Sequence, residues 1–119
     1  MRKLIIKVEH LPYAELSLNS RLHWVVKARA VRASREEIGW LAKVQWHNEK
    51  PMMNARISYE FCVKDKRRRD LDNLITKPWV DGLVDVGVLW DDDTKHLEIG
   101  SIKVVSDNTE KTIITIEEL

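Results

Sequence analysis

Apolar and polar residues alternate in four segments of the chain, and each alternation predicts a β-strand with one buried face. The clearest is residues 56–63, where Ile, Tyr, Phe and Val occupy every second position. The four predicted strands cover residues 3–9, 56–63, 96–105 and 110–117, and a turn at Asp107-Asn108 joins the last two. The alternation changes phase near Gly100-Ser101, which predicts a β-bulge in the third strand.

A helical repeat of apolar residues begins after Ser34. Ser34 and Glu37 have the spacing of a capping box with Ser34 as the N-cap, and the apolar positions that follow repeat at a spacing of three and four. The predicted helix runs to about residue 47 and has ended by Pro51. The preceding stretch, residues 10–33, is interpreted as a long basic loop that can hold a short helix.

Apolar residues at helical spacing also predict an amphipathic helix from Leu71 to Val86, with Lys77 and Asp81 on its polar face. Pro78 does not fit a helix interior, because proline lacks the N–H group and its ring clashes with the preceding turn. The helix therefore either kinks at Pro78 or begins late enough for the proline to lie in its first turn. Gly87 fits a C-terminal stop.

The order of the elements predicts an α+β fold, in which a small mixed sheet of about four strands carries two packed helices. The 119 residues suit a single domain, residues 1–119. Hydrophobic residues make up 44% and charged residues 33% of the chain, which is typical of globular proteins and not of disordered ones. No apolar run approaches the roughly 20 residues of a membrane span. The single cysteine, Cys62, cannot form an internal disulfide, and a cytoplasmic location is expected.

The formal net charge of +1 conceals two regions of opposite sign. Residues 70–93 contain seven aspartates and one lysine, a formal charge of −6. The rest of the chain has 19 basic and 12 acidic residues, a formal charge of +7. A balanced total argues against a uniformly basic DNA-binding protein. The asymmetry within one domain instead indicates an acidic site set in a basic surface.

The acidic region has the composition of a divalent-cation site. Asp70 and Asp72 are two residues apart, so in extended backbone both carboxylates point the same way. Asp91-Asp92-Asp93 follows further along, and the intervening helix and the return segment 87–90 can bring the two groups together. Neighbouring carboxylates repel unless a cation neutralises them, and Mg²⁺ prefers oxygen ligands. Phosphodiester cleavage uses such a site, and Lys77 would add positive charge at the phosphate.

Basic residues precede the acidic region and are candidates for contacts with DNA phosphates. The candidates are Lys66, Arg67, Arg68 and Arg69 in one continuous run, and Arg21, Lys27, Arg29 and Arg32 in the predicted loop. Structural alternatives stand beside these interpretations. Asp70 would then cap a helix, Asp91 to Asp93 would form a solvated loop, and the basic run would be a solvated surface.

A combined motif covers about residues 66–93. It consists of Arg67-Arg68-Arg69-Asp70-Leu71-Asp72-Asn73-Leu74, Lys77, Asp81-Gly82-Leu83 and Gly87-Val88-Leu89-Trp90-Asp91-Asp92. This motif resembles the RusA family of Holliday junction resolvases, the crossover-junction endodeoxyribonucleases of bacteria, their phages and prophages. A weaker resemblance extends over residues 19–34. The spacing from Asn73 to Lys77 is one residue longer than in the family pattern, with Thr76 as the extra residue.

The resemblance implies a small homodimer of RusA-like fold that binds four-way DNA junctions in recombination and repair. It implies paired symmetric nicks made with Mg²⁺, for which Mn²⁺ is expected to substitute, and an origin in a phage or prophage. The implied metal ligands are Asp70, Asp72 and Asp92, with Asp91 beside them. The first three are also the implied catalytic carboxylates, and Lys77 is the implied catalytic lysine.

Two other functions stay open at this stage. The chain could be a less selective nuclease for branched or flapped DNA, which a comparison of junction, linear duplex and flap substrates would separate. It could also be a non-catalytic DNA-binding module whose acids only balance charge. Such a module would bind junctions but would bind neither Mg²⁺ nor Mn²⁺.

Overall fold

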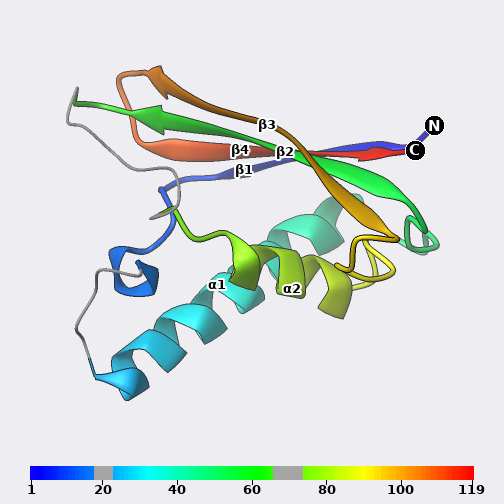
Figure 1. The fold of residues 1–119 in the computed structure, drawn as a ribbon, viewed down its shortest axis with the longest axis horizontal. Helices are drawn as coiled ribbons and strands as arrows, with labels where there is room; N and C mark the ends of the chain where they lie inside the picture. Colours follow the sequence, from blue (N-terminus) through cyan, green and yellow to red (C-terminus); the bar gives the residue numbers. More distant parts are fainter. Residues whose placement is uncertain (18–22, 66–73) are drawn as a thin grey trace.

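The computed structural model describes residues 1–17, 23–65 and 74–119. Its elements are β1 (Lys3–Val8), the short 3-10 helix η1 (Ala14–Leu16), α1 (Trp24–Gln45), β2 (Ala55–Val63), α2 (Lys77–Asp85), β3 (Leu97–Ser106) and β4 (Lys111–Glu118). The four strands form one mixed sheet, and both helices pack on the same face of it (Figure 1). This arrangement confirms the predicted α+β class and all four predicted strands. No helix in the described ranges is long and apolar enough to cross a membrane.

The strand order in the sheet is β1-β4-β2-β3, which leaves β1 and β3 at the two edges. β4 is antiparallel to both β1 and β2, whereas β2 and β3 are parallel. Parallel strands need a crossover connection, and α2 provides it between β2 and β3. The register moves from Ile57–Ile99 to Tyr59–Ile102, so Gly100 and Ser101 lie opposite Ser58 alone. This confirms the predicted β-bulge.

The core lies between the sheet and the two helices. Every second residue of β1, β2 and β4 points toward the helices, and Ile6, Ile57, Ile114 and Ile116 are fully buried there. Ile38 and Ala42 from α1 and Trp79 and Leu83 from α2 complete the same cluster. The alternation in the sequence therefore marks the helix-facing side of the sheet, as a half-buried strand requires.

The prediction that α1 begins at Ser34 is wrong. Its N-cap is His23, eleven residues before the predicted N-cap, and Nδ1 of His23 accepts a hydrogen bond from Val25 N at 3.2 Å. Ser34 is buried in the helix interior and its hydroxyl donates to Ala30 O at 2.8 Å. Glu37 does not cap the helix. Its Oε1 lies 2.7 Å from Nε2 of His10, a contact that is an ion pair when the histidine is protonated. Ala30 and Ser34, the buried residues in the first half of α1, have too little hydrophobicity to reveal a buried face.

The second helix begins at Lys77, so the alternative in which Pro78 lies in the first turn is confirmed and no kink occurs. The segment predicted as its first turns lies before the helix or outside the described residues. Gly82 packs directly on α1, where an added Cβ would overlap with Ile38 Cγ2. Gly87 follows the helix with a φ of +80°, a conformation that favours glycine and turns the chain away from α2.

Candidate active site

The first turn of α2 fixes the position of Lys77. Thr76 is the N-cap residue, and Trp79 N and Val80 N donate to its carbonyl oxygen at 3.0 and 3.2 Å. The Thr76 side chain also hydrogen-bonds Tyr59 on β2, although burial dominates there and raises the pKa of Tyr59 to about 12. Thr76, the extra residue of the motif, is therefore the N-cap of α2 and lies before the first helical residue, Lys77. An extra residue at this place does not rotate Lys77 about the helix axis.

The segment after α2 returns alongside the helix toward its first turn. Met52 forms an isolated parallel bridge with Leu89, and its amide donates to Val88 O at 2.8 Å while its carbonyl accepts from Trp90 N at 3.1 Å. Val88 and Leu89 are buried in the core, which anchors this return. The return brings Asp92 to Lys77. The predicted meeting of Asp91 to Asp93 with Asp70 and Asp72 stays a prediction, because those two residues lie outside the described ranges.

Lys77 lies between two carboxylates. Its Nζ donates to Asp92 Oδ2 at 3.0 Å and to Asp81 Oδ1 at 3.1 Å, and its side chain is 70% exposed. The hydrogen bonds to Asp92 and then Asp81 raise the pKa of Lys77. The hydrogen bond from Lys77 lowers the pKa of Asp92. At neutral pH the group thus holds an ammonium and an ionised Asp92 in contact, both open to solvent.

The three consecutive aspartates have different partners. Asp93 Oδ1 accepts hydrogen bonds from Lys95 N at 3.0 Å and His96 N at 3.1 Å, which turns the chain into β3. Asp91 Oδ1 accepts from Asp92 N at 2.7 Å. Of these three carboxylates, only that of Asp92 contacts Lys77 in the described structure. Geometry therefore distinguishes Asp92 where the sequence did not.

Several predicted site residues lie outside the described residues. These are Asp70 and Asp72, the basic run Lys66, Arg67, Arg68 and Arg69, and Arg21. Lys27, Arg29 and Arg32 are described, but they lie on the N-terminal half of α1 and not in a loop. Arg29 and Arg32 are exposed there.

The two helices run in the same direction (Figure 1). Gly82 of α2 lies against Arg35 of α1, and further along Val86 lies against Gly39. The N-terminal half of α1, with its basic residues, is therefore on the same side of the helical layer as Lys77.

Asp81, Thr76 and Tyr59 were not among the predicted site residues. The spacing of Lys77 and Asp81 could have revealed their contact, because residues four apart are neighbours on a helix. The cap and the contact with Tyr59 depend on where the helix begins relative to β2. Sequence periodicity alone placed that start too early.

The described residues fit part of the ligand set of a hard divalent-cation site. In the described ranges no three of the His, Cys, Asp and Glu residues come together as a complete ligand set. Asp81 and Asp92 nevertheless direct carboxylate oxygens at a single cationic group, Lys77 Nζ, within 3.1 Å. Carboxylate oxygens are the ligands that Mg²⁺ prefers, and Mg²⁺ sites use one or two protein carboxylates plus waters.

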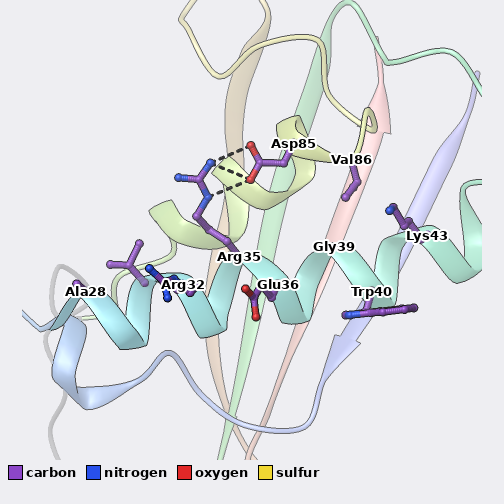
Figure 2. Close-up of a pocket in the computed structure, with 10 residues that line it drawn as sticks. Ala28, Arg32, Arg35, Glu36, Gly39, Trp40, Lys43, Asp85 and Val86 are labelled. Atoms are coloured by element: carbon purple, nitrogen blue, oxygen red, sulfur yellow. Dashed lines mark hydrogen bonds and ion pairs between the residues drawn. The ribbon is translucent and has the colours of Figure 1, made fainter. Parts of the chain in front are cut away.

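A second ion pair flanks the other end of α2. Arg35 Nε and Nη2 donate to Asp85 at 2.8–3.0 Å, and Figure 2 shows the guanidinium reaching from α1 to the last turn of α2. A groove of about 610 Å³ lies beside this pair, and its lining includes Arg32, Trp40 and Lys43. The pair binds both carboxylate oxygens of Asp85 to Arg35 and joins the two helices.

Comparison with known proteins adds one match and one absence. The family model described as Endodeoxyribonuclease RusA matches residues 16–117 of the 119. The chain matches no curated protein. The matched range covers both α-helices and every strand except β1 and the last residue of β4.

Proposed function

The chain belongs to the RusA endodeoxyribonuclease family, and on that premise we propose that it makes paired symmetric nicks in four-way DNA junctions, using Mg²⁺. Family membership makes it a Holliday junction-resolving endonuclease whose partner is branched DNA. The proposal adds the metal, the symmetry of the two cuts and a homodimer. Mn²⁺ is expected to replace Mg²⁺, and a phage or prophage origin stays a prediction from the resemblance.

One observation carries the proposal. The chain folds back so that Asp92 meets Lys77 at 3.0 Å, although fifteen positions separate them. In metal-dependent phosphodiester cleavage a carboxylate can hold the cation, and an ammonium beside it can stabilise the charge that develops on the phosphate. Proteins also place such pairs at surfaces for no catalytic purpose, and the family assignment supports the catalytic interpretation here.

The proposed ligands are Asp70, Asp72 and Asp92, with Asp91 beside them. The bound Mg²⁺ would supply an activated water and positive charge at the scissile phosphate. Asp92 suits this role because the lowered pKa of its carboxyl keeps it ionised at neutral pH. Asp93 does not, because Lys95 N and His96 N already engage its carboxylate.

Lys77 is proposed to contact the phosphate that is cut. Its pKa is raised, so it is protonated at neutral pH, and its exposed position on the first turn of α2 lets Nζ reach a phosphate oxygen. A positive charge placed there stabilises the charge that develops in the transition state. Asp81, one turn further along α2, orients the lysine through its own hydrogen bond to Nζ.

Contacts with the junction arms are proposed for the basic residues. Lys66 to Arg69 and Arg21 belong to this set by sequence, and Arg29 and Arg32 extend it along the exposed surface of α1. Such contacts position the enzyme through phosphates and read no base sequence. Binding should therefore weaken steeply with salt.

The test is cleavage of a synthetic four-way junction in Mg²⁺, compared with linear duplex and flap substrates. We expect paired nicks in the junction, and loss of cutting with retained binding for Asp72→Asn. Equal cutting of flap and junction would favour the less selective nuclease. Junction binding without cutting, together with no Mn²⁺ site on titration, would favour the non-catalytic module and overturn the proposal.

A further inference from the structure

The edge strand β3 exposes apolar side chains that the helices do not cover. Ile99, Ile102 and Val104 pair with Ile57, Tyr59 and Phe61 of β2, so they point to the helix-facing side of the sheet. Their exposed fractions are 64%, 42% and 42%. On the opposite edge, the equivalent residues of β1 are at most 3% exposed. Among the described residues, β3 has a strand partner only on its β2 side.

We propose that β3 pairs with β3 of a second copy of this chain, antiparallel, across a two-fold axis between Gly100 and Ser101. The inference rests on the homodimer of the proposed function and goes beyond it by assigning the surface that joins the copies. In this register Ile99 lies opposite the partner's Ile102. The unpaired backbone groups of the edge then form hydrogen bonds across the axis, as in strand addition.

The β-bulge makes this two-fold register possible. Residues opposite each other in antiparallel strands share a face, but positions 99 and 102 of a regular strand would point to opposite faces. Here β3 uses two residues where β2 uses one, and the phase changes between them. Ile99 and Ile102 therefore share a face. Gly100 permits the bulge, because a Cβ there would overlap with Ser58 Oγ.

Charge on the other face of β3 is self-complementary in the same register. Glu98 and Lys103 pair with Arg56 and Glu60 of β2, so both point to the face without helices. The two-fold axis places Glu98 opposite the partner's Lys103, and Lys103 opposite the partner's Glu98. Two opposite-charge pairs and two apolar pairs thus coincide in one register. This complementarity favours a second copy over an unrelated strand.

The arrangement also suits two symmetric cuts. A two-fold axis perpendicular to the sheet keeps both helical layers on the same side. β3 begins at Leu97, shortly after the aspartates, so the two sites lie beyond opposite ends of the paired strands. The two copies of Leu97 would be roughly 20 Å apart along the strands, at about 3.3 Å per residue.

The test is sedimentation equilibrium without DNA or metal, on wild type, Glu98→Lys, Lys103→Glu and a mixture of the two variants. Wild type should have twice the 14.0 kDa chain mass. Each variant places like charges opposite each other twice, which should raise the dimer dissociation constant about tenfold. The mixture should recover much of the wild-type affinity, because one variant then carries lysine and the other glutamate at both positions, so both pairs across the axis of a mixed dimer are opposite in charge. Lys3→Glu on β1 is the matched control and should change nothing.

Ile102→Asp should give a monomer, with circular dichroism showing that the chain stays folded. A monomeric wild type would overturn the inference. A dimer that survives Glu98→Lys, Lys103→Glu and Ile102→Asp unchanged would show that another surface joins the copies. A dimer that follows these expectations but never cuts junctions would refute the proposed function and leave this surface intact.

Discussion

The two ends of α2 each hold an ion pair, and the pairs differ in what they leave free. At the C-terminal end, the planar guanidinium of Arg35 donates to both carboxylate oxygens of Asp85 through three short contacts. At the N-terminal end, the single ammonium of Lys77 is shared by Asp92 and Asp81. An ammonium on a flexible stem changes partners readily, whereas a bidentate guanidinium pair is geometrically fixed. Similar distances therefore accompany a helix-joining contact at one end and, at the other, an arrangement that we propose to be catalytic.

Chelation of divalent cations should distinguish the two ends of α2 most strongly, because it should abolish cutting without changing stability. EDTA should reduce junction cutting by more than about a thousandfold, because in our proposal the metal would supply the attacking water and charge at the phosphate. The melting temperature should stay unchanged, since neither the core nor the Arg35–Asp85 pair involves a metal. Cutting rate and thermal denaturation, measured in the same buffer, check both expectations. Full cutting in EDTA would refute the metal dependence.

Removal of the ammonium tests the N-terminal pair alone. Lys77→Met should lower the cutting rate about a hundredfold to a thousandfold, as expected for loss of one charge at a developing oxyanion. Junction affinity should change little, because one phosphate contact among many is lost. Single-turnover cutting and a gel shift measure the two effects. A large loss of affinity with unchanged single-turnover rate would place Lys77 in binding and not in chemistry.

Removal of the Arg35–Asp85 pair at the C-terminal end of α2 should lower stability slightly and leave activity unchanged. Asp85→Asn should lower the melting temperature by a few degrees at most, because exposed ion pairs contribute little. Its cutting rate should match that of wild type. Equal losses of activity in Asp85→Asn and Lys77→Met would remove the distinction between the two ends.

The smallest effect concerns the titration of Asp92. The hydrogen bond from Lys77 lowers the pKa of Asp92 in the folded chain below the ordinary value of 3.8. The ionised carboxylate therefore stabilises the fold above pH 3.8, and this stabilisation is lost as the pH falls through the lowered pKa. Lys77→Met should raise the pKa of Asp92 toward 3.8. Carboxyl carbon NMR over the acidic pH range would measure the midpoint, with Asp85→Asn as the control. An unchanged midpoint would mean that Lys77 does not contact Asp92 in solution.

The strands and the bulge could be predicted from sequence because alternation reports directly on a half-buried sheet. The start of α1 could not, because Ala30 and Ser34 form its buried stripe with little hydrophobic signal. The alternation in β3 also gave no sign that Ile99 and Ile102 stay exposed. That outcome depends on how far across the sheet the two helices reach.

For the site, the sequence identified Lys77 and the aspartates, and Asp92 was favoured over its neighbours only by the family resemblance, not by composition or spacing. The choice depends on tertiary contacts, since Met52 fixes the return segment and the backbone after Asp93 uses that carboxylate. Asp70, Asp72 and the basic run stay predictions, because they lie outside the described residues.

The most direct test of the account measures nicking of a synthetic four-way junction against Mn²⁺ concentration for Asp92→Asn and Asp85→Asn, side by side. Both variants remove one carboxylate charge next to the same helix, so they differ in position and not in chemistry. We expect Asp85→Asn to follow the wild-type curve. Asp92→Asn should cut at least about a hundredfold more slowly at every Mn²⁺ concentration while still binding the junction. Equal curves for the two variants would contradict the assignment of the active site to the N-terminal end of α2.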